Sequence, residues 1–325
     1  MAAAEQIKSL IKSFGDGDES RFFATAMQIA ASEARKGHTT FAQELKKLIE
    51  KAKKERSVNY LDKNKTIPIL KPKRELNELI ELFHPKINLQ DMILDEKVRT
   101  SLNRIVQEQI KIDILRQYDL NPRRKLLLTG PPGCGKTMTA QALAGELGLA
   151  VFIIRLDGLI SKYMGESISK LRLIFDAMQD YRGVYLFDEF DSIGAHRNQG
   201  QEVGEIKRVL NSFLINIEKD QSNSIIIAAT NLPETLDKAL FRRFDDIIYY
   251  PLPSLKDIKS ILEKNLANFS LSNKSSFQKI AKEAVGLSHS DIVKSCEDAI
   301  KDMIINGTNK ISTTALIYSL QQRKQ

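Results

Sequence analysis

The chain has 325 residues, a net charge of +8 and 28% charged residues, and this length allows two or three compact units. No apolar run approaches the ~18 residues of a membrane span, and the first residues lack the basic and apolar segments of a secretory signal. The two cysteines, Cys134 and Cys296, are far apart and form no CxxC pair, which argues against a disulfide framework or zinc site and favours a reducing, cytoplasmic location.

The positive charge is concentrated near the N-terminus. Residues 1–74 hold 16 Lys and Arg against 9 Asp and Glu, most densely between Lys46 and Lys73. A solvated helix face that continues into a flexible linker explains such a cluster. An acidic protein surface or nucleic acid would also be attracted to it, but no aromatic residues are interleaved for base stacking, so nucleic acid stays an alternative.

Apolar residues at helical spacing predict three short helices within residues 1–56. Their apolar faces lie at 7–14, 22–30 and 41–49. A small bundle of this kind is typical of an adaptor or partner-binding unit. The polar segment 57–72, which contains Pro68 and Pro72, predicts a linker.

From residue 73 to residue 250, apolar strands alternate with helices, which predicts an α/β domain with a parallel sheet covered on both faces. The strands are expected at 125–128, 151–155, 183–187, 224–229 and 246–250. After Pro251 and Pro253 the sequence predicts a smaller helical domain over 251–325. Its four helices are expected at 258–269, 276–285, 290–305 and 312–320.

Residues 130–137 read GPPGCGKT, which fits the phosphate-loop pattern G-x-x-x-x-G-K-[ST]. A predicted strand precedes this segment and a predicted helix follows it, as the pattern requires. We expect backbone N–H groups and the helix N-terminus to surround phosphates, with Lys136 reaching the β and γ phosphates and the Thr137 hydroxyl binding Mg²⁺. The expected nucleotide contacts are Gly130, Pro131, Pro132, Gly133, Cys134, Gly135, Lys136, Thr137 and Met138.

Polar side chains follow two of the predicted strands. Strand 183–187 ends in Asp188 and Glu189; we expect Asp188 to hold Mg²⁺ through its water shell and Glu189 to orient and polarise the attacking water. Adjacent acids also occur in plain strand-to-loop turns, but a phosphate loop upstream favours the catalytic role. Asn231 follows another strand, where it would either reach the γ-phosphate or the attacking water, or simply start a turn.

From about Leu89 to the C-terminus the chain resembles the AAA+ ATPases, in particular the protein-remodelling branch that carries the second region of homology. Residues 188–197, DEFDSIGAHR, resemble the extended acidic motif of that family, and Asn231 falls on its first sensor position. Residues 236–245, LDKALFRRFD, resemble its arginine-finger segment, and 286–292, GLSHSDI, resemble a segment of its small domain. The resemblance implies that the nucleotide is ATP with Mg²⁺.

The resemblance also implies that Arg242 and Arg243 face the nucleotide of an adjacent subunit. A positive group supplied in this way increases the rate of phosphoryl transfer ~10³- to 10⁵-fold, because it stabilises charge in the transition state. A surface arginine pair beside Asp245 and Asp246 is the simpler alternative. If the arginines act in trans, a closed ring is implied, most often a hexamer in this family.

The segment Lys162, Tyr163, Met164 and Gly165 resembles the substrate-gripping pore loop of the remodelling ATPases. Tyr163 and Met164 would give sequence-tolerant apolar contact with an extended polypeptide, since Met adapts to varied partners, and Gly165 would let the loop move. A core tyrosine in a loop is the alternative. The resemblance favours threading of protein over loading of DNA.

The chain departs from the family pattern at His289, where glycine usually lies close to the nucleotide base. Ser288 and Asp291 fit a capping box, so a helix still begins there. The sequence leaves open whether His289 stacks near adenine or points to solvent.

These features imply an ATP-driven, ring-forming protein remodeller. Segments 18–23 and 29–37 are similar to small prokaryotic AAA ATPases encoded beside a subtilisin-like serine peptidase in phage defense, in which case the ATPase would control or feed that protease. The alternatives are a nucleotide-controlled scaffold and a DNA-associated ATPase. A small GTPase is disfavoured, because no N-K-x-D-like motif follows the acidic pair.

Overall fold

The computed structural model describes residues 8, 19–58, 76, 79–159, 166–193, 200–236, 238–271 and 277–324. The first predicted helix, most of the predicted linker and the predicted pore loop at 162–165 lie outside these residues. The chain forms two compact units, Met1–Lys65 and Thr66–Gln325.

The described part of the first unit is a pair of helices, α2 (Glu19–Arg35) and α3 (Thr39–Val58), joined by a tight turn. They pack through Ala26, Ala30 and Ile49, with Leu45 against them. Gly37 has φ +90° in the turn, a conformation that glycine adopts without steric cost. The second and third helices predicted in this region are thereby confirmed.

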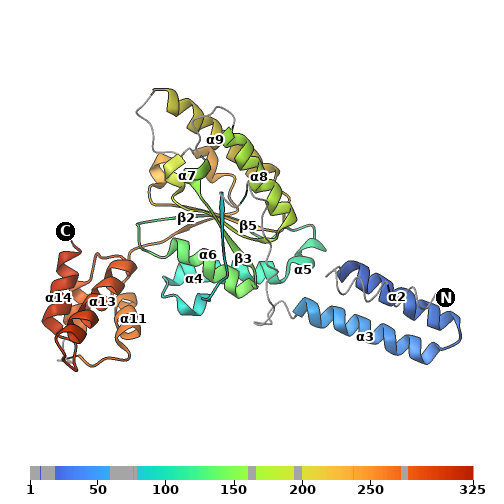
Figure 1. The fold of residues 1–325 in the computed structure, drawn as a ribbon, viewed down its shortest axis with the longest axis horizontal. Helices are drawn as coiled ribbons and strands as arrows, with labels where there is room; N and C mark the ends of the chain where they lie inside the picture. The colour runs from blue at the N-terminus through green and yellow to red at the C-terminus, as the bar shows by residue number, and fades with distance from the viewer. Residues whose placement is uncertain are drawn as a thin grey trace. The chain divides into compact units, whose positions relative to one another are not determined.

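The second unit is built on a six-stranded sheet (Figure 1). The strand order is β1-β3-β4-β5-β2-β6. The strands are β1 (Ile80–Phe83), β2 (Lys125–Thr129), β3 (Ala150–Ile154), β4 (Gly183–Phe187), β5 (Ile225–Thr230) and β6 (Asp246–Tyr249). All neighbours pair in parallel except β1, which pairs antiparallel with β3. The five predicted strands are confirmed to within one residue at each end. The edge strand β1 was not predicted from the sequence, because a pattern of four residues is too short to be recognised as a strand.

Helices cover both faces of the sheet, as predicted. Leu126 and Leu128 of β2 pack with α4 (Glu96–Ile110) and α6 (Lys136–Leu147). Leu127, between them, packs on the other face with α8 (Glu166–Asp180) and α9 (Gly200–Lys219). Successive side chains of a strand point to opposite faces, so a strand buried on both sides reads as an unbroken apolar run.

Short helical segments connect these elements. They are η2 (Leu89–Asp91), α5 (Ile112–Arg116), α7 (Leu156–Leu159), η3 (Phe190–Ile193), η4 (Pro233–Thr235) and α10 (Lys238–Phe241). Of these, η3 directly follows the β4 strand end and η4 follows that of β5, so both lie next to the acidic and amide residues predicted to be functional.

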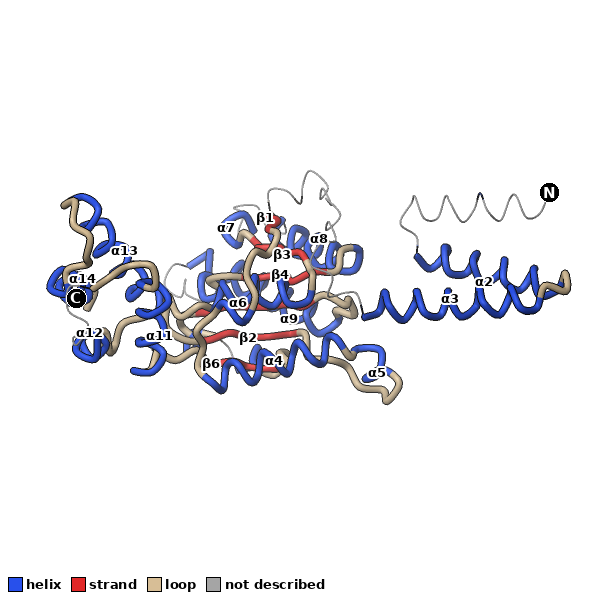
Figure 2. Tube along the Cα trace, turned by 90° about the horizontal axis from the view of Figure 1, so that it is seen from below, coloured by secondary structure: helices blue, strands red, loops and turns tan. Residues whose placement is uncertain are grey.

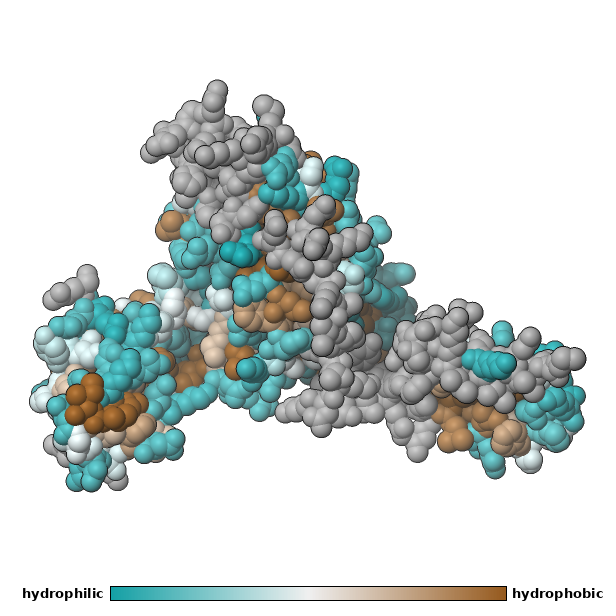
Figure 3. Space-filling model, in the orientation of Figure 1, coloured by the Kyte–Doolittle hydropathy of each residue, from teal (hydrophilic) through white to brown (hydrophobic). Residues whose placement is uncertain are grey.

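The described residues after β6 form four helices (Figure 2), which share an apolar core of their own. They are α11 (Leu255–Leu266), α12 (Phe277–Glu283), α13 (His289–Ile305) and α14 (Thr313–Gln322), each within three residues of its predicted bounds. Ser288 and Asp291 form the predicted capping box at the start of α13, and Ser254 and Asp257 form another at the start of α11. Figure 3 shows apolar side chains gathered on the surface of these helices.

Candidate active site

The phosphate loop joins the end of β2 to the start of α6. Gly130, Gly133 and Gly135 have φ angles of +137°, +73° and +96°, which residues other than glycine rarely adopt. A Cβ at Gly130 would lie 2.2 Å from the Tyr250 carbonyl oxygen, and one at Gly133 would lie 2.5 Å from Ser288 Oγ. Both positions therefore need glycine for space as well as for conformation.

The side chain of Lys136 is held by the loop and by the neighbouring strand β5. Its Nζ donates to the carbonyl oxygens of Gly130 (2.7 Å) and Pro131 (2.8 Å) and to Asn231 Oδ1 (2.7 Å). The residue is only 7% exposed, and burial lowers the pKa of its ammonium. The structure thus brings together Lys136 and Asn231, two of the predicted site residues, from segments 95 positions apart.

A second pair of predicted residues meets beside the loop. Thr137 Oγ1 donates to Asp188 Oδ2 at 2.6 Å, so a hydroxyl and a carboxylate lie together where Mg²⁺ was expected. Hydroxyl and carboxylate oxygens are suitable ligands for this hard cation. In the described residues no three His, Cys, Asp or Glu side chains form a metal site, so Mg²⁺ here would take further ligands from phosphate and water.

Glu189 follows Asp188 in an unusual backbone conformation. Its φ is +49°, in the left-handed region that costs a non-glycine residue ~1–2 kcal/mol. Its N–H donates to Asp188 Oδ1 at 2.9 Å, and both residues line the same cavity as Lys136. Strained residues of this kind cluster at active sites; the catalytic role of Glu189 stays a prediction.

Asp191 is a site residue to which the sequence analysis assigned no role. Its Oδ1 accepts from Thr230 Oγ1 (3.0 Å) and from the backbone N–H of Asn231 (3.2 Å). It therefore ties η3, after β4, to the end of β5 and fixes the residue that contacts Lys136. The signal that could have found it is its position as a third acid in the run after β4.

Lys136, Thr137, Asp188, Glu189 and Asn231 line a cavity of about 720 Å³ that lies between the phosphate loop and the C-terminal helices, a size suited to a small-molecule ligand. The α/β part supplies residues 91–93, 132–138, 188, 189 and 231 to its wall. Helices α11 and α13 supply Ile261, Lys264, Asn265, His289, Ser290, Val293, Lys294 and Glu297. His289, whose direction the sequence left open, is part of this wall.

The predicted arginines do not line this cavity. They lie just before β6, at its amino end, whereas the phosphate loop follows the carboxyl end of the adjacent, parallel β2. Arg242 is exposed. Arg243 pairs with Glu218 at 3.3 Å and donates to the Ala239 carbonyl oxygen at 3.3 Å. The chain does not bring either arginine to its own phosphate loop.

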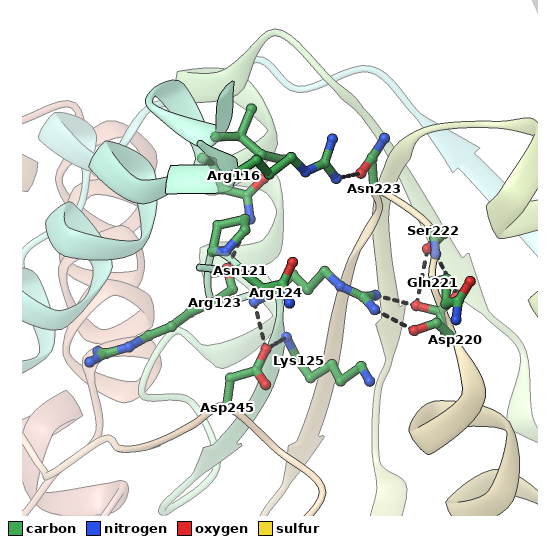
Figure 4. A pocket seen from close by; sticks show the side chains of 13 residues that line it. Arg116, Asn121, Arg123, Arg124, Lys125, Asp220, Gln221, Ser222, Asn223 and Asp245 are labelled. Atoms are coloured by element: carbon green, nitrogen blue, oxygen red, sulfur yellow. Dashed lines mark hydrogen bonds and ion pairs between the residues drawn. The ribbon is translucent and has the colours of Figure 1, made fainter. Parts of the chain in front are cut away.

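A second cavity, of about 650 Å³, lies at the amino ends of β2 and β5. In Figure 4, Arg124 pairs with Asp220, Arg116 bonds Asn223, and Asp245 accepts from the backbone of the strand start. The Asp220 side chain is 1% exposed, so its pair with Arg124 is a buried structural contact. Internal partners satisfy most of these charges, and we assign the cavity no chemistry.

The fold and the loop define a phosphate-loop nucleotide-binding protein. Comparison with known proteins identifies its family. Residues 126–252 match the family model of the "ATPase family associated with various cellular activities (AAA)". The chain is 34% identical to the "uncharacterized AAA family ATPase y4kL" of Sinorhizobium fredii. The alignment of 321 residues covers 99% of this chain and 95% of that protein. The protein belongs to the AAA family of ATPases.

A second relative aligns with about two thirds of this chain. The "meiotic spindle formation protein mei-1" of Caenorhabditis elegans is 32% identical over 219 residues, which covers 66% of this chain and 46% of that protein. Across the described ranges, no helix has the length and apolar character needed to span a membrane.

Proposed function

We propose that the protein binds and hydrolyses ATP with Mg²⁺ in the cavity beside the phosphate loop. The observation that carries this proposal is the contact of Lys136 with Asn231, next to the Thr137–Asp188 pair. A cation, a hydroxyl, a carboxylate and an amide meet at the edge of the sheet where a glycine loop opens onto a helix N-terminus. This set suits a bound triphosphate and its metal.

Each residue has a distinct role in this proposal. Lys136 and the N–H groups of residues 130–138 bind the phosphates, while Thr137 and Asp188 hold Mg²⁺, which would neutralise phosphate charge when bound. Glu189 orients and polarises the attacking water, and Asn231 positions the water or the γ-phosphate. Asp191 acts through Asn231 by fixing its backbone.

The catalytic site is proposed to be completed by an adjacent subunit. Arg242 and Arg243 lie before the amino end of β6, remote from their own phosphate loop, so any contact that they make with a nucleotide would be with that of a neighbouring subunit. A contact between two different surfaces repeats head to tail and closes into a ring when the rotation allows. We propose such a ring, with six subunits as the expected number.

The energy of hydrolysis is proposed to drive remodelling of a protein substrate. The family membership supports the motor, and the similarity of residues 162–165 to a pore loop supports the threading of polypeptide. For the relative mei-1, the name indicates a part in forming the meiotic spindle, which suits an ATPase that acts on protein assemblies. A nucleotide-controlled scaffold and a DNA-associated ATPase are the alternatives.

The chain is proposed to have four parts: a partner-binding bundle at 1–56, a linker at 57–72, the α/β ATPase domain at 73–250 and the helical domain at 251–325. The bundle would dock either the substrate or a subtilisin-like serine protease in a cytoplasmic defense system. Its surplus of lysines supports an acidic partner surface.

Nucleotide binding by a Lys136→Ala variant tests the proposal. A hydrogen bond to a charged group contributes ~1.5–3 kcal/mol, so ATP affinity should fall about 10- to 100-fold in equilibrium titration. Lys125→Ala is the matched control, because Lys125 is also partly buried and has a lowered pKa but lies at the other end of β2. Equal ATP affinity in both variants would contradict the proposed site.

A further inference from the structure

Two buried hydroxyl groups, those of Tyr250 and Thr139, form a hydrogen bond next to the phosphate loop. Tyr250 directly follows β6 and is 2% exposed, and Thr139 lies in the first turn of α6 and is fully buried. Their hydroxyl oxygens lie 2.7 Å apart. Burial of a hydroxyl group is unfavourable unless it is hydrogen-bonded, so this bond holds the two side chains to each other.

The direction of the bond follows from a second contact of Thr139. The Thr139 hydroxyl donates to the carbonyl oxygen of Gly135 at 3.0 Å. Because a hydroxyl has a single proton, Thr139 must accept the proton of the Tyr250 hydroxyl. Burial raises the pKa of Tyr250, and the bond to Thr139 opposes this only in part, so the phenol keeps its proton at neutral pH. The proton of Tyr250 thus starts a chain of two hydrogen bonds that ends on Gly135.

The chain ends on the peptide group that joins the phosphate loop to α6. The Gly135 carbonyl oxygen accepts from the Thr139 hydroxyl and also from the Thr139 backbone N–H, at 2.9 Å. The C=O of Gly135 and the N–H of Lys136 belong to one planar trans peptide and point in opposite directions. Holding the carbonyl toward Thr139 therefore aims the Lys136 N–H out of the helix N-terminus, where N–H groups without an intrahelical partner bind phosphate.

The backbone of Tyr250 contacts the other end of the loop. Its N–H donates at 2.7 Å to the carbonyl oxygen of Thr129, the residue directly before the loop. Its own carbonyl oxygen lies so close to Gly130 that a Cβ there would be 2.2 Å away. Tyr250 therefore contacts the start of the loop with its backbone and reaches the last glycine of the loop through its side chain.

We propose that Tyr250 is a positioning residue for the phosphate loop, which acts through Thr139 to hold the Gly135–Lys136 peptide in the orientation that binds phosphate. This inference rests on the proposed ATP site. A glycine-rich loop can adopt several backbone conformations, and the hydroxyl chain favours one of them. Without the chain, the loop is competent for binding during a smaller fraction of the time, and the apparent affinity for ATP falls by that fraction.

The first test is Tyr250→Phe in the full chain, which removes only the hydroxyl, with equilibrium titration of ATP as the readout. ATP affinity should fall about 2- to 13-fold, which corresponds to the ~0.5–1.5 kcal/mol of one net hydrogen bond. Tyr185→Phe is the matched control. The Tyr185 phenol is also buried and donates to the Tyr181 carbonyl oxygen at 2.8 Å, but it lies in the core on the opposite face of the sheet. Both changes should lower the thermal unfolding midpoint, whereas only Tyr250→Phe should weaken ATP binding.

A double-mutant cycle tests whether Tyr250 acts through Thr139. Thr139→Val removes the hydroxyl that links Tyr250 to Gly135, so this variant should also bind ATP more weakly than the wild type. In the Thr139→Val background, Tyr250→Phe should cause no further loss of ATP affinity, because residues in one hydrogen-bonded network are not additive.

Three outcomes would overturn the inference. They are an ATP affinity of Tyr250→Phe equal to that of the wild type, an equal loss of affinity in Tyr185→Phe, and fully additive losses in the double variant. Lys136→Ala separates the inference from the proposed function. If ATP binding by the wild type is absent or does not depend on Lys136, the proposed site fails as well; if binding depends on Lys136 but not on the Tyr250 hydroxyl, only the inference fails.

Discussion

The ammonium of Lys136 lies 2.7 Å from the amide oxygen of Asn231. This contact joins the phosphate loop to the end of β5 and makes the position of the lysine depend on a residue from another strand. Asn231 is in turn fixed by Asp191, which accepts from its backbone N–H. Lys136 and the acidic run after β4 are therefore parts of one hydrogen-bonded unit.

Replacing Asn231 by alanine should lower kcat more than ATP affinity. The amide is proposed to position the attacking water or the γ-phosphate, and removal of one such oriented polar group costs ~10²–10³ in kcat at comparable sites. Steady-state ATPase assays and ATP titration would measure the two effects. Asn223→Ala is the matched control, since this amide precedes the other end of β5 and bonds Arg116. Equal kcat values for the two variants would rule out the role of Asn231.

Replacing Asp191 by alanine should reproduce part of the Asn231→Ala defect. The change removes the acceptor for Thr230 Oγ1 and for the Asn231 N–H without removing a group that touches nucleotide. In the double variant Asp191→Ala/Asn231→Ala the two losses in kcat should not add, because residues in one network act as a unit. Fully additive losses would show that Asp191 does not act through Asn231.

Gly133→Ala should be far more damaging than Gly307→Ala. Both glycines have positive φ, +73° and +62°, so both changes carry the conformational cost of ~1–2 kcal/mol. Only at Gly133 would the new Cβ also meet a neighbour, Ser288 Oγ at 2.5 Å, whereas nothing lies within 4 Å at Gly307. We expect Gly133→Ala to weaken ATP binding in equilibrium titration and Gly307→Ala to leave it unchanged. Comparable ATP affinities would argue against a close contact between the loop and α13.

Removing the buried carboxylate of Asp220 should strongly destabilise the α/β unit. Asp220 pairs with Arg124 and accepts from Gln179 Nε2 (3.1 Å) and Ser222 N (3.2 Å). Loss of one partner from a buried pair costs ~3–5 kcal/mol, so Asp220→Ala should lower the thermal unfolding midpoint by several degrees. Asp298→Ala is the control, because its pair with Arg323 is partly exposed and such pairs contribute less than ~1 kcal/mol. Similar midpoints would contradict the structural role of Asp220.

The lowered pKa of His289 predicts a loss of stability in mild acid. The unfolded chain binds a proton at the ordinary pKa of ~6.5, but burial makes the folded state bind it only at lower pH. The contribution of His289 is therefore fully present above the ordinary value and is lost as pH falls from there toward the folded pKa. Urea unfolding from pH 7.5 to 5 should show a steeper decline for the wild type than for His289→Phe. Parallel curves would mean that His289 protonates equally well in both states.

Local patterns were sufficient to predict most of the fold. The doubly buried strands read as apolar runs because both faces of the sheet are covered, and the Ser288–Asp291 spacing predicted the start of α13, which the structure confirms. The edge strand β1 was not predicted, since Ile80–Phe83 is only four residues long and one side of it is exposed. Its pairing with β3 depends on a tertiary contact that no local pattern encodes.

The candidate site was predictable as a set of residues but not as an arrangement. The glycine loop, Asp188 and Asn231 each follow a strand, and parallel strands bring their carboxyl ends to one edge. That Lys136 contacts Asn231, that Glu189 takes a positive φ and that His289 joins the cavity wall all depend on how distant segments pack. The roles proposed for these residues, and for the arginines, stay predictions.

The central claim is that each ATP site is shared between two subunits, and a mixing experiment tests it directly. ATPase turnover would be measured for Glu189→Gln, for the double variant Arg242→Ala/Arg243→Ala, and for their equimolar mixture assembled together. Each variant alone should be inactive. In a random ring about a quarter of the interfaces would combine an intact Glu189 with intact arginines, so the mixture should regain up to about a quarter of the wild-type turnover per chain. A mixture as inactive as its components, or arginine variants with wild-type turnover, would contradict the account.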